Sequence, residues 1–129
     1  MNLNFNQIAE IYFAHNELQE MKMPFKLGLI IAKNLVALKT EYEFYIERER
    51  EFAFKYLEAD EETGGFKQIQ EGVFKIKDGL EKECQDAREE LNKFEVEINL
   101  REIPENLLEN MELSPKTIMA LENLIKEEE

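Results

Sequence analysis

The feature that most constrains this chain is an amphipathic pattern that begins at about Pro24 and ends at about Glu58. Its spacing predicts one continuous helix with one buried face. At 1.5 Å per residue the helix would be roughly 50 Å long, whereas a domain of this size is roughly 30 Å across. Part of it is therefore expected to project, unless another element or chain covers it. The apolar stripe consists of Ile31, Leu35, Leu38, Tyr42, Tyr45, Phe52 and Tyr56.

Shorter patterns predict the elements near the two ends of the chain. Asn4 followed three residues later by Gln7 has the pattern of a capping box and predicts the start of a first helix. Alternating apolar and polar residues over 94–100 predict a strand with one solvated face. Ser114 and Pro115 predict the N-cap and first residue of a final short helix. That helix is expected to contain Ile118, Leu121, Leu124 and Ile125.

The middle of the chain is expected to turn back on the long helix. Residues 66–70 and 73–77 predict a hairpin whose turn lies at Glu71 and Gly72. A third helix is expected to start near residue 78 and to run antiparallel to the long helix, with Leu91 and Leu38 on the shared face. The predicted fold is a single α+β domain over residues 1–129. It combines a long amphipathic helix in an antiparallel helical hairpin with a small antiparallel sheet and short terminal helices.

Charge and composition exclude several classes of function. The chain carries 29 acidic and 16 basic side chains, for a net charge of −13. Nucleic acids and anionic membrane surfaces both attract clustered Lys and Arg, so neither is an expected partner. The longest apolar stretch, residues 27–32, is far shorter than the roughly 20 residues that span a bilayer. A single cysteine and the absence of a signal-like start favour a reducing cytoplasm.

No recognisable catalytic motif stands in the sequence, and the many glutamates have no spacing that would nominate a catalytic pair. His15 is the sole histidine, and we interpret it as a packed helix residue because no nucleophile or carboxylate stands at a motif spacing from it. A general base or metal ligand is the alternative. Cys84 falls in the apolar positions of the third helix and is interpreted as a small hydrophobe. We expect no catalytic site, no metal and no cofactor, and therefore not an enzyme.

One segment runs against the overall charge of the chain. Residues 21–40, called the basic segment here, contain four lysines and no Asp or Glu. Lys22 and Lys26 lie at the expected start of the long helix, where free backbone N–H groups favour anions. Together with Lys33 and Asn34 they form a candidate anion or nucleotide site. A solvated helix face is the alternative.

Two further sets on the long helix are candidate contact surfaces. Glu43, Glu47 and Glu51 follow at four-residue spacing and form an acidic ridge that would suit a partner with a basic surface. Pairing with Arg48 or Arg50 is the alternative. An aromatic line on the same helix predicts a homo-oligomer, most simply a dimer, unless the third helix covers it. It comprises Phe44, Tyr45, Phe52 and Tyr56.

Several short stretches resemble a known family. They are Met23-Pro24-Phe25-Lys26, Ile31-Ala32-Lys33-Asn34-Leu35, Tyr45-Ile46-Glu47-Arg48, Phe94-Glu95-Val96-Glu97-Ile98, Leu113-Ser114-Pro115 and Met119-Ala120-Leu121-Glu122. Together they resemble a family of small uncharacterised proteins encoded by phages and prophages of Gram-positive bacteria. The resemblance implies a protein that acts in the cytoplasm of a bacterial host. It brings no reaction and no functional residues.

The leading functional hypothesis is therefore a non-enzymatic phage accessory protein that acts by binding. It would most plausibly antagonise a host protein, such as a component of host defence. Two alternatives stay open: a component of the virion or of tail assembly, and a protein that sequesters an anionic nucleotide signal through the basic segment.

Overall fold

A computed structural model describes residues 1–127 and divides the chain into two compact units. The first unit joins Met1–Glu43 to the segment that starts at Glu95, and the second unit is Phe44–Phe94. Helix α2 (Phe25–Tyr56) begins in the first unit and ends in the second. Its bounds agree with the helix predicted from the sequence to within two residues.

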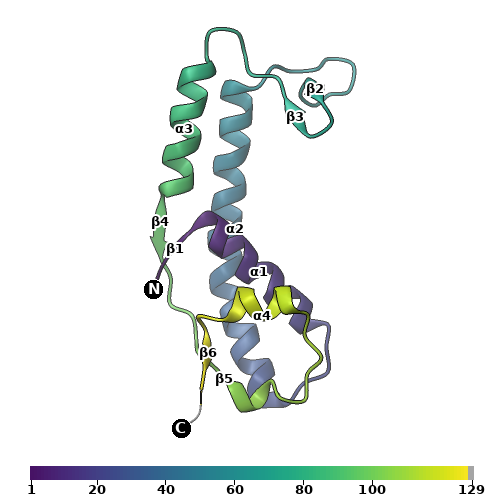
Figure 1. Ribbon diagram of the computed structural model, residues 1–129, viewed down its shortest axis with the longest axis vertical. Helices are drawn as coiled ribbons and strands as arrows, with labels where there is room; N and C mark the ends of the chain where they lie inside the picture. Colours follow the sequence, from purple (N-terminus) through teal and green to yellow (C-terminus); the bar gives the residue numbers. More distant parts are fainter. Residues whose placement is uncertain (128–129) are drawn as a thin grey trace. The chain divides into compact units, whose positions relative to one another are not determined.

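Between residues 1 and 127 the chain forms four α-helices and six short strands, which confirms the predicted α+β class and helical hairpin. The helices are α1 (Phe5–Gln19), α2, α3 (Glu81–Lys93) and α4 (Pro115–Leu121), with one 3₁₀ turn, η1 (Glu105–Leu107). The strands are β1 (Asn2–Asn4), β2 (Gln68–Gln70), β3 (Val73–Phe74), β4 (Glu95–Glu97), β5 (Ile103–Pro104) and β6 (Ile125–Lys126). Figure 1 labels each of them.

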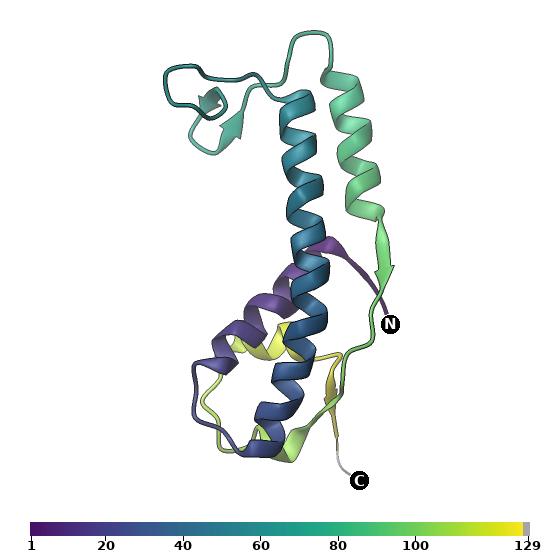
Figure 2. The same cartoon turned by 180° about the vertical axis from the view of Figure 1, so that it is seen from behind.

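Local capping chemistry starts both short helices of the first unit. The Asn4 side chain accepts from the backbone of Gln7 at 2.8 Å, and the Gln7 side chain accepts from the backbone of Asn4 at 2.9 Å. Ser114 accepts from the backbone of Thr117 at 3.3 Å and caps α4. Both predicted caps are confirmed. Helix α4 lies beside α1 (Figure 2), and the core around them includes Ile8, Leu18, Leu27, Ile31, Leu38, Leu121 and Leu124.

Two strand pairings complete the first unit. Strand β1, which the sequence did not indicate, pairs antiparallel with β4, and Leu3 faces Val96. The prediction that Leu124 and Ile125 belong to the final helix is wrong: α4 ends at Leu121, Leu124 lies in the turn that follows, and Ile125 pairs with Ile103 in the parallel ladder of β5 and β6. A helix of seven residues has little stability of its own, and the chain leaves it to pair with β5, where Ile103 is fully buried.

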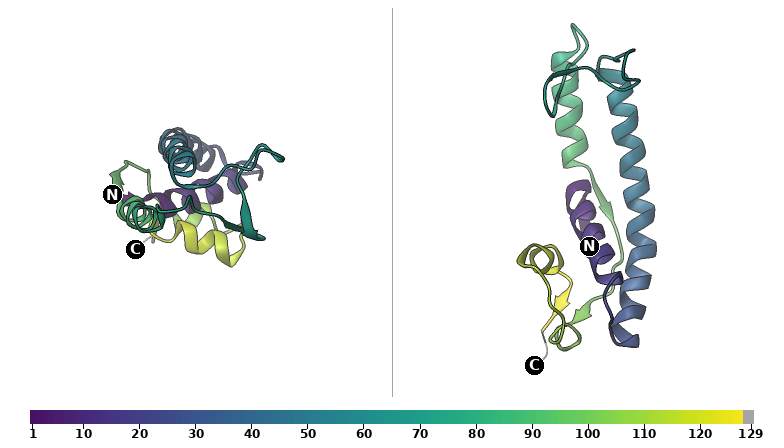
Figure 3. Two further views of the ribbon diagram at one scale, coloured as in Figure 1. Left: turned by 90° about the horizontal axis from the view of Figure 1, so that it is seen from above. Right: turned by 90° about the vertical axis from the view of Figure 1, so that its right-hand side faces the viewer.

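The second unit contains the hairpin and α3. Gly72 has φ of 79° at the turn between β2 and β3, a left-handed conformation that glycine adopts without strain, and this confirms the predicted hairpin. Helix α3 runs antiparallel beside the C-terminal part of α2 (Figure 3). Leu38 is fully buried in the first unit and Leu91 is half-buried in the second, and their shared face stays a prediction.

Candidate functional site

The first half of α2 presents apolar side chains on two opposite faces. One face lies in the core of the first unit and holds Leu27, Ile30, Ile31 and Leu38. The opposite face carries a second set at spacings of four, three and four residues, which we call the seam: Phe25, Leu29, Ala32 and Val36. Phe25 is 85% exposed, Val36 71% and Leu29 42%. A helix that is apolar on both faces is normally covered on both, whereas the described residues leave the seam exposed.

The seam lies within the basic segment. Lys22, Lys26 and Lys33 are exposed, and none of them forms an ion pair with any residue between 1 and 127. Lys26 and Lys33 are seven residues apart and therefore flank the seam on the same side, about a quarter turn away. Lys39 approaches Glu43 at 3.9 Å. The seam is thus bordered by lysines whose positive charge the described residues leave largely uncompensated.

Asn34 is committed to the interior and is not available to the predicted anion site. It is 1% exposed, and its amide nitrogen donates both to Nε2 of His15 at 3.1 Å and to the carbonyl oxygen of Arg101 at 3.1 Å. Its side-chain oxygen accepts from the backbone N–H of Arg101 at 2.7 Å. Every polar atom of the Asn34 amide is therefore satisfied within the first unit, and the anion-site prediction retains only its three exposed lysines.

His15 is a structural residue held in one tautomer. Its Nδ1 donates to the carbonyl oxygen of Ile11 at 2.9 Å, because a carbonyl can only accept, so Nε2 is left to accept from Asn34. The ring is fully buried. Burial lowers the pKa of His15 below its ordinary value, against a smaller opposing effect of the hydrogen bond to Ile11. The neutral imidazole is hydrogen-bonded through both ring nitrogens, which agrees with the interpretation of His15 as a packed residue.

The aromatic line on α2 is covered in part by its own unit. Arg88 of α3 binds both carboxylate oxygens of Glu49 through its two terminal nitrogens, and its guanidinium lies 4.2 Å from the centre of the Phe52 ring. The hydrogen bond with Glu49 raises the pKa of Arg88 above its ordinary value. Tyr56 is only 6% exposed and Phe44 is 42% exposed. Of the four predicted interface residues, Tyr56 is thus enclosed, Tyr45 and Phe52 are half-buried, and Phe44 faces solvent.

The acidic ridge is exposed but partly neutralised. Glu51 pairs with Arg48 at 3.1 Å, as the alternative to partner binding predicted, and Glu43 approaches Lys39. Glu47 is exposed on the same helix. Exposed pairs of this kind contribute little stability, but they reduce the net negative charge that the ridge presents.

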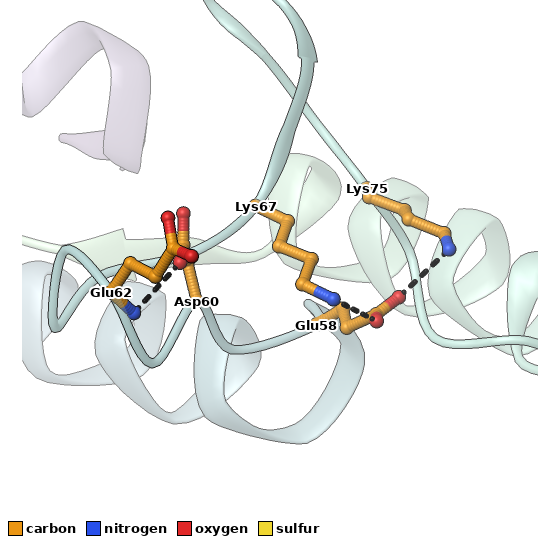
Figure 4. Close-up of polar contacts among 5 residues, drawn as sticks. All are labelled: Glu58, Asp60, Glu62, Lys67 and Lys75. Carbon is orange, nitrogen blue, oxygen red and sulfur yellow. Dashed lines mark hydrogen bonds and ion pairs between the residues drawn. The ribbon is translucent and has the colours of Figure 1, made fainter.

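An open hollow of about 770 Å³ lies beside the hairpin of the second unit and is lined mainly by charged residues. The Glu58 carboxylate lies between the ammonium groups of Lys67, at 2.9 Å, and Lys75, at 3.0 Å (Figure 4). Hydrogen bonds from these two lysines lower the pKa of Glu58, and the carboxylate in turn raises the pKa of Lys75. The described lining residues include no Ser, Cys or His. The two ion pairs of Glu58 tie the hairpin to the end of α2.

A groove of about 600 Å³ separates α1 from α4 in the first unit. Phe13, 53% exposed, and Met119, 73% exposed, form its apolar part. Glu17 accepts a hydrogen bond from the Thr117 hydroxyl and links the two helices. Lys116 lies on the same rim as Glu17, so the rim carries both signs of charge and selects no class of partner.

Reactive and metal-binding chemistry is not supported by the described part of the chain. Burial raises the pKa of the Cys84 thiol, which keeps it protonated and poorly nucleophilic. No group of three His, Cys, Asp or Glu side chains among residues 1–127 is placed to hold a metal ion. None of the described helices is long and apolar enough to cross a membrane.

Comparison with protein-family models, with curated proteins and with solved structures finds no match to this chain. Its function is therefore inferred from its own residues. The seam is the surface that the sequence-based prediction missed, because the search for a helical stripe identified only the face through Ile31 and Leu38. The signal was present as the four-three-four spacing from Phe25 to Val36.

Proposed function

We propose that this chain is a non-catalytic binding protein that attaches to another protein through the seam on α2. The observation that carries the proposal is the exposure of Phe25 and Val36 on a helix whose opposite face is already buried. Large apolar side chains gathered on one exposed face are typical of protein interaction sites. The chain is otherwise rich in charged residues. The exposed apolar face of α2 contributes nothing to the packing of the first unit, because the opposite face of the helix forms the core contacts.

The resemblance to phage and prophage proteins supports a biological setting for this binding. In that setting the partner is a protein of the bacterial host, the site of action is the host cytoplasm, and the effect is to occupy and antagonise the partner. A component of host defence is the most direct target for such an accessory protein. The net charge of −13 supports a protein partner over a nucleic acid.

The seam and the acidic ridge are rival contact surfaces. The ridge offers charge alone, and two of its three glutamates already approach cationic neighbours on α2. The seam offers apolar side chains that a partner would remove from water. Burial of apolar surface is the dominant favourable term in most protein associations. We therefore place the principal contact on the seam.

We also propose that the chain forms a homodimer, independently of its binding through the seam. Phe44 is exposed on α2 and supports the predicted homodimer, whereas Tyr56 cannot contribute because its own unit encloses it. Light scattering at micromolar concentration distinguishes a dimer from a monomer of 15.3 kDa. A monomer at every concentration would remove the dimer and leave the binding function intact.

The function is tested by affinity purification from the bacterial host with matched variants. Val36→Asp places a charge in the seam, and Ile69→Asp places the same charge on a β-branched residue of β2 that is equally exposed, at 71%. We expect the wild type and Ile69→Asp to recover the same host protein and Val36→Asp to lose it. Equal recovery by all three proteins, or detection of the chain as a component of purified virions, would overturn the proposal.

A further inference from the structure

The seam has the geometry that accepts one helix. Its members follow at four, three and four residues, which is the spacing of the apolar positions where two helices pack side by side. From Phe25 to Val36 the seam is about 17 Å long at 1.5 Å per residue. A helix of roughly three turns would cover this length. The surface continues along a regular helix and is not enclosed, so an extended peptide would find no strand edge to pair with.

The charges beside the seam define the chemistry of that helix. Lys26 and Lys33 flank the seam on one side, and Lys22 precedes it. The basic segment contains no carboxylate to neutralise them. In paired helices, the residues that border the apolar contact select the partner through opposite charge.

We propose that the seam receives an amphipathic helix of a partner protein whose apolar stripe is flanked by Asp and Glu. Apolar side chains of that helix pack against Phe25, Leu29 and Val36. Its carboxylates pair with the flanking lysines. The proposal rests on the binding function proposed for the seam and adds the class of partner.

A second copy of the chain fits this surface poorly. Antiparallel pairing of two seams over residues 25–36 places Phe25 opposite Val36 and Leu29 opposite Ala32. The same pairing brings two basic segments together, with four lysines on each and no acidic side chain from either. Like charges that face each other across a helix pair are unfavourable. Charge therefore favours an acidic helix over self-pairing.

The test measures binding of designed helical peptides to the full chain by fluorescence anisotropy. Two peptides of about three heptads share one apolar pattern and carry either Glu or Lys at every flanking position. We expect the Glu peptide to bind at least about tenfold more tightly than the Lys peptide, and the difference to shrink as salt screens the charges. Lys26→Glu with Lys33→Glu should reverse the preference, whereas Val36→Asp should weaken both peptides and Ile69→Asp neither. Circular dichroism checks that each variant keeps its helix content.

Other outcomes would overturn the inference in distinguishable ways. Equal affinity for the two peptides, or tighter binding of the Lys peptide by the wild type, would show that the partner is not an acidic helix. Failure of both peptides, with a host protein still lost on Val36→Asp, would retain the binding function and exclude this partner class. Failure of both peptides with no effect of Val36→Asp on host-protein recovery would remove the seam as a binding site altogether. Self-association that Val36→Asp abolishes would identify a second copy as the occupant.

Discussion

Replacing Asn34 with alanine tests whether one buried amide joins α1, α2 and the segment before β5. The substitution removes hydrogen bonds to Nε2 of His15 and to both backbone groups of Arg101. A buried acceptor left without a donor costs about 1–3 kcal/mol, which applies to His15 because its ring is fully enclosed. The Arg101 groups are nearer the surface and can reach water, so they add about 1 kcal/mol. With the lost side-chain volume, we expect Asn34→Ala to lower the free energy of unfolding by about 3–5 kcal/mol.

Urea unfolding followed by far-ultraviolet circular dichroism at neutral pH measures this loss. Lys33→Ala is the matched control, since Lys33 is an exposed neighbour on the same helix, and it should change the free energy of unfolding by less than about 0.5 kcal/mol. The double variant with His15→Leu should cost less than the sum of the two single variants, because it removes the orphaned ring nitrogen. A loss below about 1 kcal/mol for Asn34→Ala, or strict additivity with His15→Leu, would refute the reasoning.

Further predictions concern pH and packing. The folded chain holds the pKa of His15 below that of the unfolded chain, so stability should fall as the pH drops below about 6.5, by up to about 1.4 kcal/mol per pH unit, and His15→Gln should flatten this slope in urea titrations. Leu38→Ala should destabilise by about 2–5 kcal/mol and the half-buried Leu91→Ala by about 1 kcal/mol; equal losses in thermal unfolding would show that the two sites are packed alike. Arg88→Met should cost about 1–2 kcal/mol by separating α3 from Glu49, and a neutral result would show that solvent already screens the pair.

Local chemistry explains which parts of the fold the sequence predicted. The capping box at Asn4 and the N-cap at Ser114 use side chains within three residues of the backbone groups they satisfy. The turn at Gly72 needs a residue that tolerates positive φ, and the sequence places glycine there. Such signals require no knowledge of distant residues, so the predicted starts of α1 and α4 and the hairpin are confirmed, whereas α3, which has no side-chain cap, starts at Glu81 and not near residue 78.

Long-range contacts explain the errors. Strand β6 exists because Ile125 meets Ile103, and no pattern within residues 115–126 encodes that pairing. Asn34 was predicted to face an anion because its neighbours are lysines, yet its partners are His15 and Arg101, which lie 19 and 67 residues away in the chain. The seam was overlooked because a helix with two apolar stripes does not reveal which one its own chain will bury.

We place the partner contact on the seam and not on the acidic ridge. The most direct measurement compares the affinity of the recovered host protein for three forms of the chain: wild type, Val36→Asp and a variant with the three ridge glutamates changed to Lys. We expect at least about a tenfold loss of affinity for Val36→Asp, roughly 1.4 kcal/mol, and a change of less than about twofold for the ridge variant. Unchanged binding of Val36→Asp together with a large loss for the ridge variant would contradict this placement.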